Sequence, residues 1–315
     1  MSSEHPFVER FKQIYSRNYK KFFIVPALAV LFCLGVIAWN YYSTGELVST
    51  GIDLKGGIIV TVGWNFSSEP SIASMKTALI SENLEKDISI SRIDAFASGK
   101  IKLRALQFEA PPEADPVKFT QSVRTVLSSE GFETDPVEYN VKIVGPAVGK
   151  VFLSNTYIAM AMGFFFLGVV IFFIFKKKAV IATVISCIFF DFLGGLATMN
   201  ILGIKLSPIT LASLLMLIGF SIDSDILITT AVLKNREGPA IDRAIFAMKT
   251  GITMALAASA SLTALYILSG TAVLKDMTVI LLGGLFFDLI HTWFTNLGVL
   301  FLIAEKESAT GAQHQ

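Results

Sequence analysis

Charged side chains interrupt several long apolar runs in this sequence. They are Asp191, Asp223, Asp225, Lys249, Asp288 and His291. An ionisable side chain at the centre of a bilayer costs roughly 2.5–3.5 kcal/mol, so several of them in one small bundle require a reason. A buried carboxylate whose charge depends on a movable cation, or on the entry of water, can take up and release a proton. The pattern therefore indicates a proton relay built from intramembrane acids.

The segment Gly219 to Asp225 carries two of these acids two residues apart. On a helix this spacing separates them by about 200°, so Asp223 and Asp225 point to nearly opposite sides. We expect Asp223 to be the buried acid, and Asp225 to reach a neighbouring helix or the membrane boundary. Lys249 either approaches these acids from the next helix or extends its ammonium group to the lipid headgroups.

The remaining candidates also have two interpretations each. Asp288 and His291 lie three residues apart on one helical face, so they either pair with each other or take part in the relay. Asp191 lies between two phenylalanines and Gly194-Gly195, in a sequence typical of close helix packing. It is therefore either an interhelical hydrogen-bonding group or a member of the relay.

The composition excludes several other classes of protein. Hydrophobic residues make up 53% of the 315 residues and charged residues only 16%, against about 45–50% and about 25% in soluble domains. The net charge of +1 disfavours a nucleic-acid partner. Cys33 and Cys187 both lie in apolar runs, and the chain has only three histidines, so neither a disulfide framework nor a metal site is expected. The GxxxxGK[ST] nucleotide-binding motif is absent, and we expect no cofactor and no enzymatic activity.

Apolar runs predict six transmembrane helices of an α-helical polytopic membrane protein. They cover residues 22–42, 154–175, 179–204, 208–233, 244–268 and 277–304. The first helix has an apolar stretch longer than that of a signal peptide and ends in bulky aromatic residues, so we expect it to remain as an anchor. The last five helices form one transmembrane region, residues 154–304.

Lysine and arginine residues in the short segments set the orientation of these helices. Only Lys205 and Lys275 lie in the short loops of one side, while the other short segments hold all the remaining basic residues. Because basic residues are retained on the cytoplasmic side, both termini are predicted to be cytoplasmic, as the segments 1–21 and 305–315. The plasma membrane is the expected location, with its lipids as partners.

The long polar segment 43–153 is then placed outside the cytoplasm. Its hydrophobic spacing predicts strands at 58–64, 88–92, 101–105 and 137–144, and helices at 70–86 and 115–131. The order βαββαβ is that of a ferredoxin-like α+β domain, with two helices on one face of an antiparallel sheet.

Two glycine-rich motifs lie at the two ends of this segment. The first contains Gly51, Asp53, Gly56 and Gly57, and the second contains Gly145, Pro146 and Gly149. The glycines permit backbone conformations that side chains forbid, and the proline stiffens the second motif. The motifs are therefore either a hinge pair between domain and bundle or plain connectors.

The same motifs carry a family resemblance. Residues 51–57 resemble the GxDLxGG signature of the protein-export membrane proteins SecD and SecF, and residues 144–149 resemble the VGPxVG motif of the SecF branch. The resemblance covers nearly the whole chain, which is identified as a member of this family in its archaeal form, separate from SecD. It implies membership of the resistance-nodulation-division superfamily, which uses intramembrane acids to draw on the proton gradient.

The chain departs from the family pattern in its fourth helix. Bacterial members have Ser-Ile-Asn-Asp where this chain has Ser221-Ile222-Asp223-Ser224, so Ser224 takes the place of the family acid. Asp223 falls instead where the SecD pattern has its acid. An Arg-Thr pair of the fifth bacterial helix is matched by Lys249-Thr250, which keeps the charge with a different shape.

The resemblance implies an auxiliary subunit that acts with SecD to promote polypeptide export through the SecYEG channel. Two alternatives remain. A proton-coupled exporter of small molecules or lipids from the same superfamily usually carries two large external domains. An intramembrane aspartic protease would pair Asp191 with Asp223, but the Gly-x-Gly-Asp sequence expected before the second acid is absent.

Overall fold

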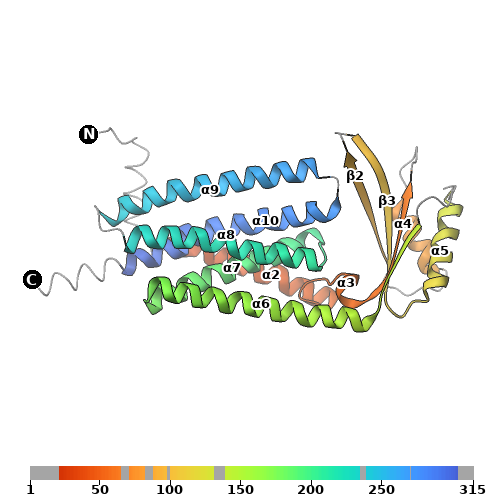
Figure 1. Ribbon diagram of the computed structural model, residues 1–315, viewed down its shortest axis with the longest axis horizontal. Coiled ribbons are helices and arrows are strands. Elements are labelled where there is room, and N and C mark those ends of the chain that lie inside the picture. The colour runs from red at the N-terminus through yellow and green to blue at the C-terminus, as the bar shows by residue number, and fades with distance from the viewer. Residues whose placement is uncertain are drawn as a thin grey trace, which may run out of the picture.

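Long helices form a bundle that carries a small α/β unit at one end (Figure 1). The computed structural model describes residues 21–64, 71–81, 88–97, 100–130, 139–234, 239–269 and 271–303. Within these residues, five helices are long and apolar enough to cross a membrane. The chain is thus a polytopic membrane protein, as its composition predicts.

These five helices agree with the first five predicted spans. They are α2 (Ile24–Thr44), α6 (Pro146–Phe175), α7 (Lys178–Leu202), α8 (Pro208–Leu233) and α9 (Ala240–Leu268). The sixth predicted span corresponds to α10 (Ala272–Ile290), which continues through a π-helical turn, η2 (His291–Asn296), into helical residues 297–303. The predicted terminal segments lie outside the described residues, apart from Lys21.

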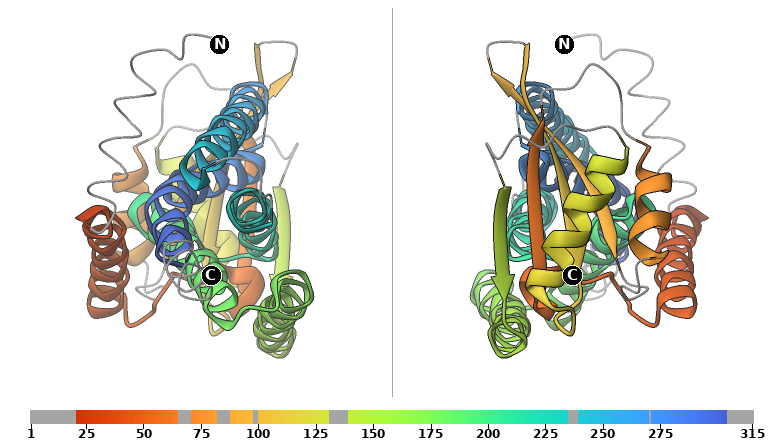
Figure 2. Two further views of the ribbon diagram at one scale, coloured as in Figure 1. Left: turned by 90° about the vertical axis from the view of Figure 1, so that its left-hand side faces the viewer. Right: turned by 90° about the vertical axis from the view of Figure 1, so that its right-hand side faces the viewer.

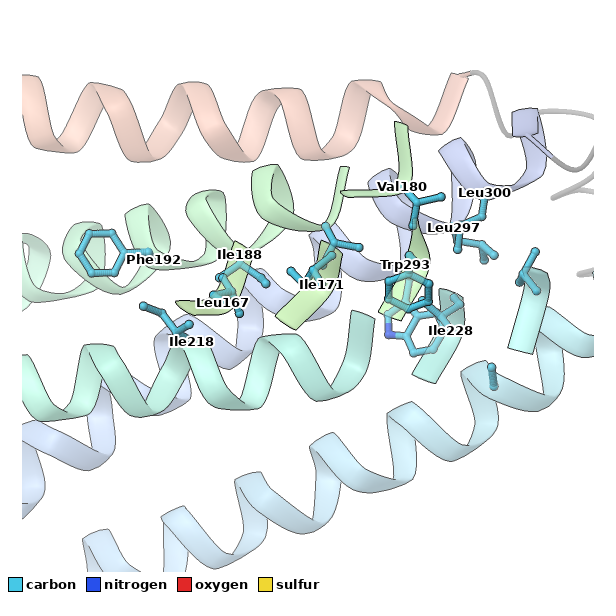
Figure 3. Packing of buried hydrophobic residues seen from close by; sticks show 14 of the residues in the cluster. Leu167, Ile171, Val180, Ile188, Phe192, Ile218, Ile228, Trp293, Leu297 and Leu300 are labelled. Carbon is cyan, nitrogen blue, oxygen red and sulfur yellow. The ribbon is translucent and has the colours of Figure 1, made fainter. Parts of the chain in front are cut away.

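The bundle interior is closely packed. Side chains from α6, α7, α8 and η2 meet in one hydrophobic cluster (Figure 3). Paired glycines let the backbones approach: a methyl group at Gly195 of α7 would lie 2.8 Å from Leu214 of α8. Carbon atoms normally pack at about 3.5–4.0 Å, so no side chain fits at this position. The predicted close packing around Gly194-Gly195 is confirmed.

The α/β unit contains four antiparallel strands in the order β2-β3-β1-β4. They are β1 (Gly57–Trp64), β2 (Ser89–Ala97), β3 (Lys100–Ala110) and β4 (Tyr139–Val144). The helices α4 (Ile72–Ser81) and α5 (Pro116–Ser129) lie on the side of the sheet away from the bundle (Figures 1 and 2). Ile58, Val60, Phe108 and Phe119 fill the space between sheet and helices. The other face of the sheet is directed toward the bundle (Figure 1).

The predicted start of α5 is confirmed, and its cause is visible. The Asp115 side chain accepts hydrogen bonds from the backbone N–H groups of Val117 at 2.8 Å and Lys118 at 3.0 Å. Pro116 occupies the first helical position, where its missing N–H group is no loss.

Two element boundaries differ from the sequence prediction. Helix α6 begins at Pro146, so the second glycine motif forms its first turn and is not a loop before residue 154. The first motif contains a short helix, α3 (Ile52–Lys55). The predicted turn at 98–99 and the end of the helix predicted at 70–86 lie outside the described residues.

Candidate functional site

Three aspartates from three helices meet inside the bundle. Asp191 of α7, Asp225 of α8 and Asp288 of α10, called the acid cluster below, are 0%, 0% and 1% exposed. Each interacts electrostatically with the others. With a rise of 1.5 Å per residue, Asp191 lies about 20 Å along α7 from Lys178, and Asp225 lies about 12 Å along α8 from Leu233. The acid cluster therefore lies within the depth of a hydrocarbon core of about 30 Å.

Asp191 links three helical segments. One of its oxygens accepts a hydrogen bond from the Ser221 hydroxyl of α8, and the other lies 2.6 Å from His291 Nδ1 of η2. The predicted interhelical hydrogen bonding of Asp191 is confirmed. The predicted pairing of His291 with Asp288 is wrong, because the imidazole reaches across to α7 instead of along its own helix.

Asp225 and Asp288 share a single hydroxyl donor. Thr292 Oγ1 lies 3.2 Å from Asp225 Oδ1 and 3.2 Å from Asp288 Oδ1. A hydroxyl group has one proton, so it cannot donate to both carboxylates. A proton on either carboxyl group would supply the missing hydrogen. The geometry thus matches a cluster that holds a proton between α8 and α10.

Other buried oxygens of the cluster also lack donors. Asn296 Nδ2 donates to Asp225 Oδ1 at 2.7 Å, while Asn296 Oδ1, Asp225 Oδ2 and Asp288 Oδ2 have no hydrogen-bond partner among the described residues. Buried polar atoms without partners are costly and are found most often at functional sites. The cluster therefore has the polar capacity for additional protons or ordered water.

The π-helical turn aligns the side chains that reach Asp225. Asp288, Thr292 and Asn296 are spaced four residues apart, and a regular α-helix would turn each about 40° past the one before it. The wider π turn from His291 to Asn296 counteracts this drift. Such turns occur frequently at functional sites, and here the turn presents a hydroxyl and an amide to one carboxylate.

The prediction for the fourth-span acids is reversed. Asp225 is the buried acid and Asp223 is exposed. The buried face of α8 includes Ser221, Asp225, Ile228, Thr229 and Val232, so the helix turns Asp223 away from the core. Two residues on a helix face nearly opposite sides, as expected, but the structure exchanges which side is which.

Asp223 lies on a stripe of α8 that no other described helix covers. This uncovered stripe consists of Ala212, Met216, Gly219 and Asp223, all exposed. A Cβ at Gly219 would have no atom within 4 Å. The carboxylate is about 15 Å from the end of α8 at Leu233, so it lies within the apolar depth of the helix.

Lys249 is exposed on α9, about 14 Å along the helix from Ala240. Within the described part of the chain, no ion pair joins it to Asp223, Asp225 or the other acids. Of the two interpretations, approach to the fourth-span acids has no support in this arrangement.

The two glycine motifs pack directly against each other. A methyl group at Gly149 of α6 would lie 2.6 Å from the backbone nitrogen of Gly56 and 2.8 Å from the carbonyl oxygen of Leu54. Gly57 has a φ of +142°, a conformation that other residues rarely adopt. The motifs therefore form a tight junction between α3 and α6. Gly145 caps α6 and Pro146 is its first residue.

An ion pair connects the first motif to the sheet. The Asp53 carboxylate of α3 lies 2.7 Å from Lys142 Nζ of β4. Beside it, Lys55 Nζ lies 2.5 Å from the carboxylate of Glu46, in the segment after α2. Gly51 lies against the loop between α7 and α8, with its N–H group donating to Leu206.

The sequence analysis missed several polar members of the cluster. They are Ser221, Thr229, Thr292 and Asn296, all buried. The spacing Asp288, Thr292, Asn296 in one apolar helix was the available signal, since it places three polar groups on one face. Among the described residues, no group of three or more His, Cys, Asp or Glu side chains is arranged to hold a metal ion.

Comparisons with known proteins point in one direction. The family model described as "Protein export membrane protein SecD/SecF, C-terminal" matches residues 125–306. The protein-export membrane protein SecF of Pyrococcus furiosus is 31% identical over 301 residues, which is 95% of this chain and 96% of that protein. SecF of Methanothermobacter thermautotrophicus is 31% identical and covers 93% of this chain and 95% of its own length.

Solved structures share the fold. The crystal structure of SecDF, a translocon-associated membrane protein from Thermus thermophilus, matches 94% of this chain with a TM-score of 0.68 and 20% identity. A second SecDF structure, in a super-membrane-facing form, matches 97% of this chain with a TM-score of 0.59. The present chain spans 38% of the first SecDF chain and 40% of the second.

Proposed function

Because this chain belongs to the SecD/SecF family of protein-export membrane proteins, we propose that it is an auxiliary subunit of the Sec machinery. In this role it acts with SecD to promote the export of polypeptides through the SecYEG channel. The translocating polypeptide is the substrate of the assembly. The curated relatives are named as membrane proteins of export, not as enzymes.

The observation that carries the proposed driving force is the acid cluster. Asp225 and Asp288 share one hydroxyl donor, so a proton arriving at this pair changes the hydrogen bonds between α8 and the α10–η2 helix. Moving one charge across the membrane potential supplies about 2.3 kcal/mol per 100 mV. This is enough to bias an equilibrium between two conformations that differ by a few kcal/mol. The relay thus consists of Asp225, Asp288 and Asp191.

Asp223 and Lys249 have a different place in this proposal. A charged side chain facing lipid at their depth costs roughly 2.5–3.5 kcal/mol, so both need cover. The uncovered stripe of α8, with its small residues Ala212 and Gly219, permits close approach of another helix. SecD is the partner that covers it, and its polar groups complete the relay at Asp223 and Lys249.

Several finer assignments belong to the same proposal. Helix α10, η2 and residues 297–303 together reach about 45 Å and form a sixth transmembrane span. The α/β unit is an extracytoplasmic ferredoxin-like domain, supported by its strand order and its two helices on one face. Both termini are cytoplasmic in the plasma membrane. The junction of Gly51, Asp53, Gly56, Gly57, Gly145, Pro146 and Gly149 is the hinge between that domain and the bundle.

The test of the driving force is export by vesicles that contain SecD, SecYEG and this chain. With a proton gradient imposed, Asp225→Asn should reduce stimulated export to the level measured with an uncoupler, while copurification with SecD is unchanged. The control Glu113→Gln removes an exposed carboxylate of the α/β unit and should leave stimulation intact. Full gradient-dependent export by Asp225→Asn would exclude the acid cluster as the relay.

The orientation has its own test. Cys33 and Cys187 are buried, so a single cysteine introduced at Ser128 is the accessible thiol for an impermeant reagent. In intact cells, Ser128→Cys on α5 should be labelled and a cysteine at Lys177 should not. The reverse pattern would invert the proposed topology.

A further inference from the structure

The loop between α7 and α8, residues 203–207, is attached to the chain entering the α/β unit. Thr50 and Leu206 form a parallel β-bridge. The Leu206 N–H group donates to Ser49 O at 2.7 Å, and the Gly51 N–H group donates to Leu206 O at 2.8 Å. A methyl group at Gly51 would lie only 3.0 Å from Leu206 O, which explains the need for glycine in this place.

One side chain of this loop reaches the sheet itself. Lys205 Nζ forms an ion pair with Glu109 Oε2 on β3. The Glu109 side chain is only 12% exposed, and its other oxygen accepts a hydrogen bond from Gln107 Nε2 at 3.0 Å. Glu109 is thus fixed on the sheet, and Lys205 holds the loop to it.

The covalent connections to the α/β unit do not come from the helices that carry the acids. The unit is joined to α2 on one side and to α6 on the other, and neither helix contains an aspartate or glutamate. The acid cluster lies on α7, α8 and α10. A movement of α7 or α8 therefore needs a noncovalent route to the sheet.

The start of α8 is rigidly joined to this route. Ser207 caps the helix in a capping box with Thr210, and the Thr210 hydroxyl lies 3.3 Å from Lys205 O. At the end of α7, Asn200 Nδ2 donates to Leu47 O at 2.9 Å. A shift of either helix along its axis therefore moves the Lys205 backbone with it.

We propose that Lys205 is a positioning residue that transmits movement of α7 and α8 to the sheet through Glu109. The inference rests on the proposed function, because the movement begins with a change of charge in the acid cluster. The loop-to-sheet ion pair makes the α/β unit follow the acid-bearing helices, while the glycine junction at α3 and α6 lets it turn. The outer end of α10 also lies near β2, so the test changes Lys205 alone.

The experiment measures the position of the α/β unit in the full chain bound to SecD. Spin labels are attached at Ser128→Cys on α5 and at Thr271→Cys between α9 and α10, both exposed positions, and the interspin distance is recorded. Asp225→Asn should shift the distance distribution when Lys205 is present. With Lys205→Met, the same substitution should give a shift at least threefold smaller.

Two further variants distinguish a transmitting pair from a merely structural one. The double variant Lys205→Glu with Glu109→Lys restores the ion pair and should recover at least half of the shift and half of gradient-stimulated export. Lys118→Met removes a lysine from the opposite side of the unit and should leave the shift unchanged. A structural contact alone would not respond to reversal of both charges.

The outcomes separate the two ideas. If Asp225→Asn shifts the distance equally in the wild-type chain and in the Lys205→Met variant, the transmitting role of Lys205 is refuted while the acid cluster keeps its role. If Asp225→Asn changes neither distance nor export in the wild-type background, the proposed function fails and the inference fails with it.

Discussion

Replacing Gly284 with alanine should force α10 away from α8. A methyl group at this position would lie 2.9 Å from Leu217 Cγ, whereas carbon atoms pack at about 3.5–4.0 Å. The two helices must therefore separate by about 0.6–1.1 Å unless Leu217 moves. Leu217 is fully buried, and the opposite side of its side chain faces Gly195 of α7, so it has no space to turn into. Such overpacking costs about 1–3 kcal/mol of unfolding free energy.

The functional effect should exceed the loss of stability. Gly284 is one helical turn from Asp288, so the separation withdraws Asp288 and Thr292 from Asp225. We expect gradient-stimulated export to fall severalfold in vesicles, together with a lower unfolding free energy in detergent. Gly35→Ala is the control, since a Cβ at Gly35 of α2 has no atom within 4 Å and alanine favours helix. Wild-type stability and export in Gly284→Ala would refute the packing argument.

Three further substitutions probe the α/β unit and its junction. Phe119→Ala removes a fully buried ring and should destabilise the unit by about 3–5 kcal/mol, seen as rapid proteolysis of residues 71–130 while the bundle stays protected. Lys142→Met should change the unfolding free energy by less than about 1 kcal/mol, because its pair with Asp53 is largely exposed; a larger loss in chemical unfolding would contradict this. Gly149→Val should prevent the close approach of α6 to the backbone at Gly56 and abolish export, whereas unchanged export would show that the junction tolerates a side chain.

Much of the architecture follows from local patterns in the sequence. Apolar length predicts the spans, and the alternation in 58–64 and 101–105 predicts β1 and β3, because these patterns reflect burial on one face. Asp115-Pro116 predicts the start of α5 because capping acts within a few residues. Such features need no knowledge of distant contacts.

The candidate site was predicted in kind but not in detail. The acids were visible because charge is rare in apolar helices, but the choice between Asp223 and Asp225 depends on the rotation of α8. That rotation is set by its contacts with α7 and α10, including the contacts at Gly195 and Gly284. The pairing of His291 with Asp191 likewise joins residues a hundred positions apart, and no local pattern contains that information.

The π turn at His291–Asn296 has one more consequence. It holds an additional residue in its turn, and Leu297 N–H donates to Thr292 O, five residues back. If the turn tightened to α-helical geometry, the chain beyond it would rotate by about 100° and advance by about 1.5 Å, like a screw. Leu297 and Leu300, now buried, would leave their sites in the core, and Asn296 would swing off its carboxylate. Hydrogen bonding around one aspartate and hydrophobic packing two turns away are therefore geared together through a single loop of backbone.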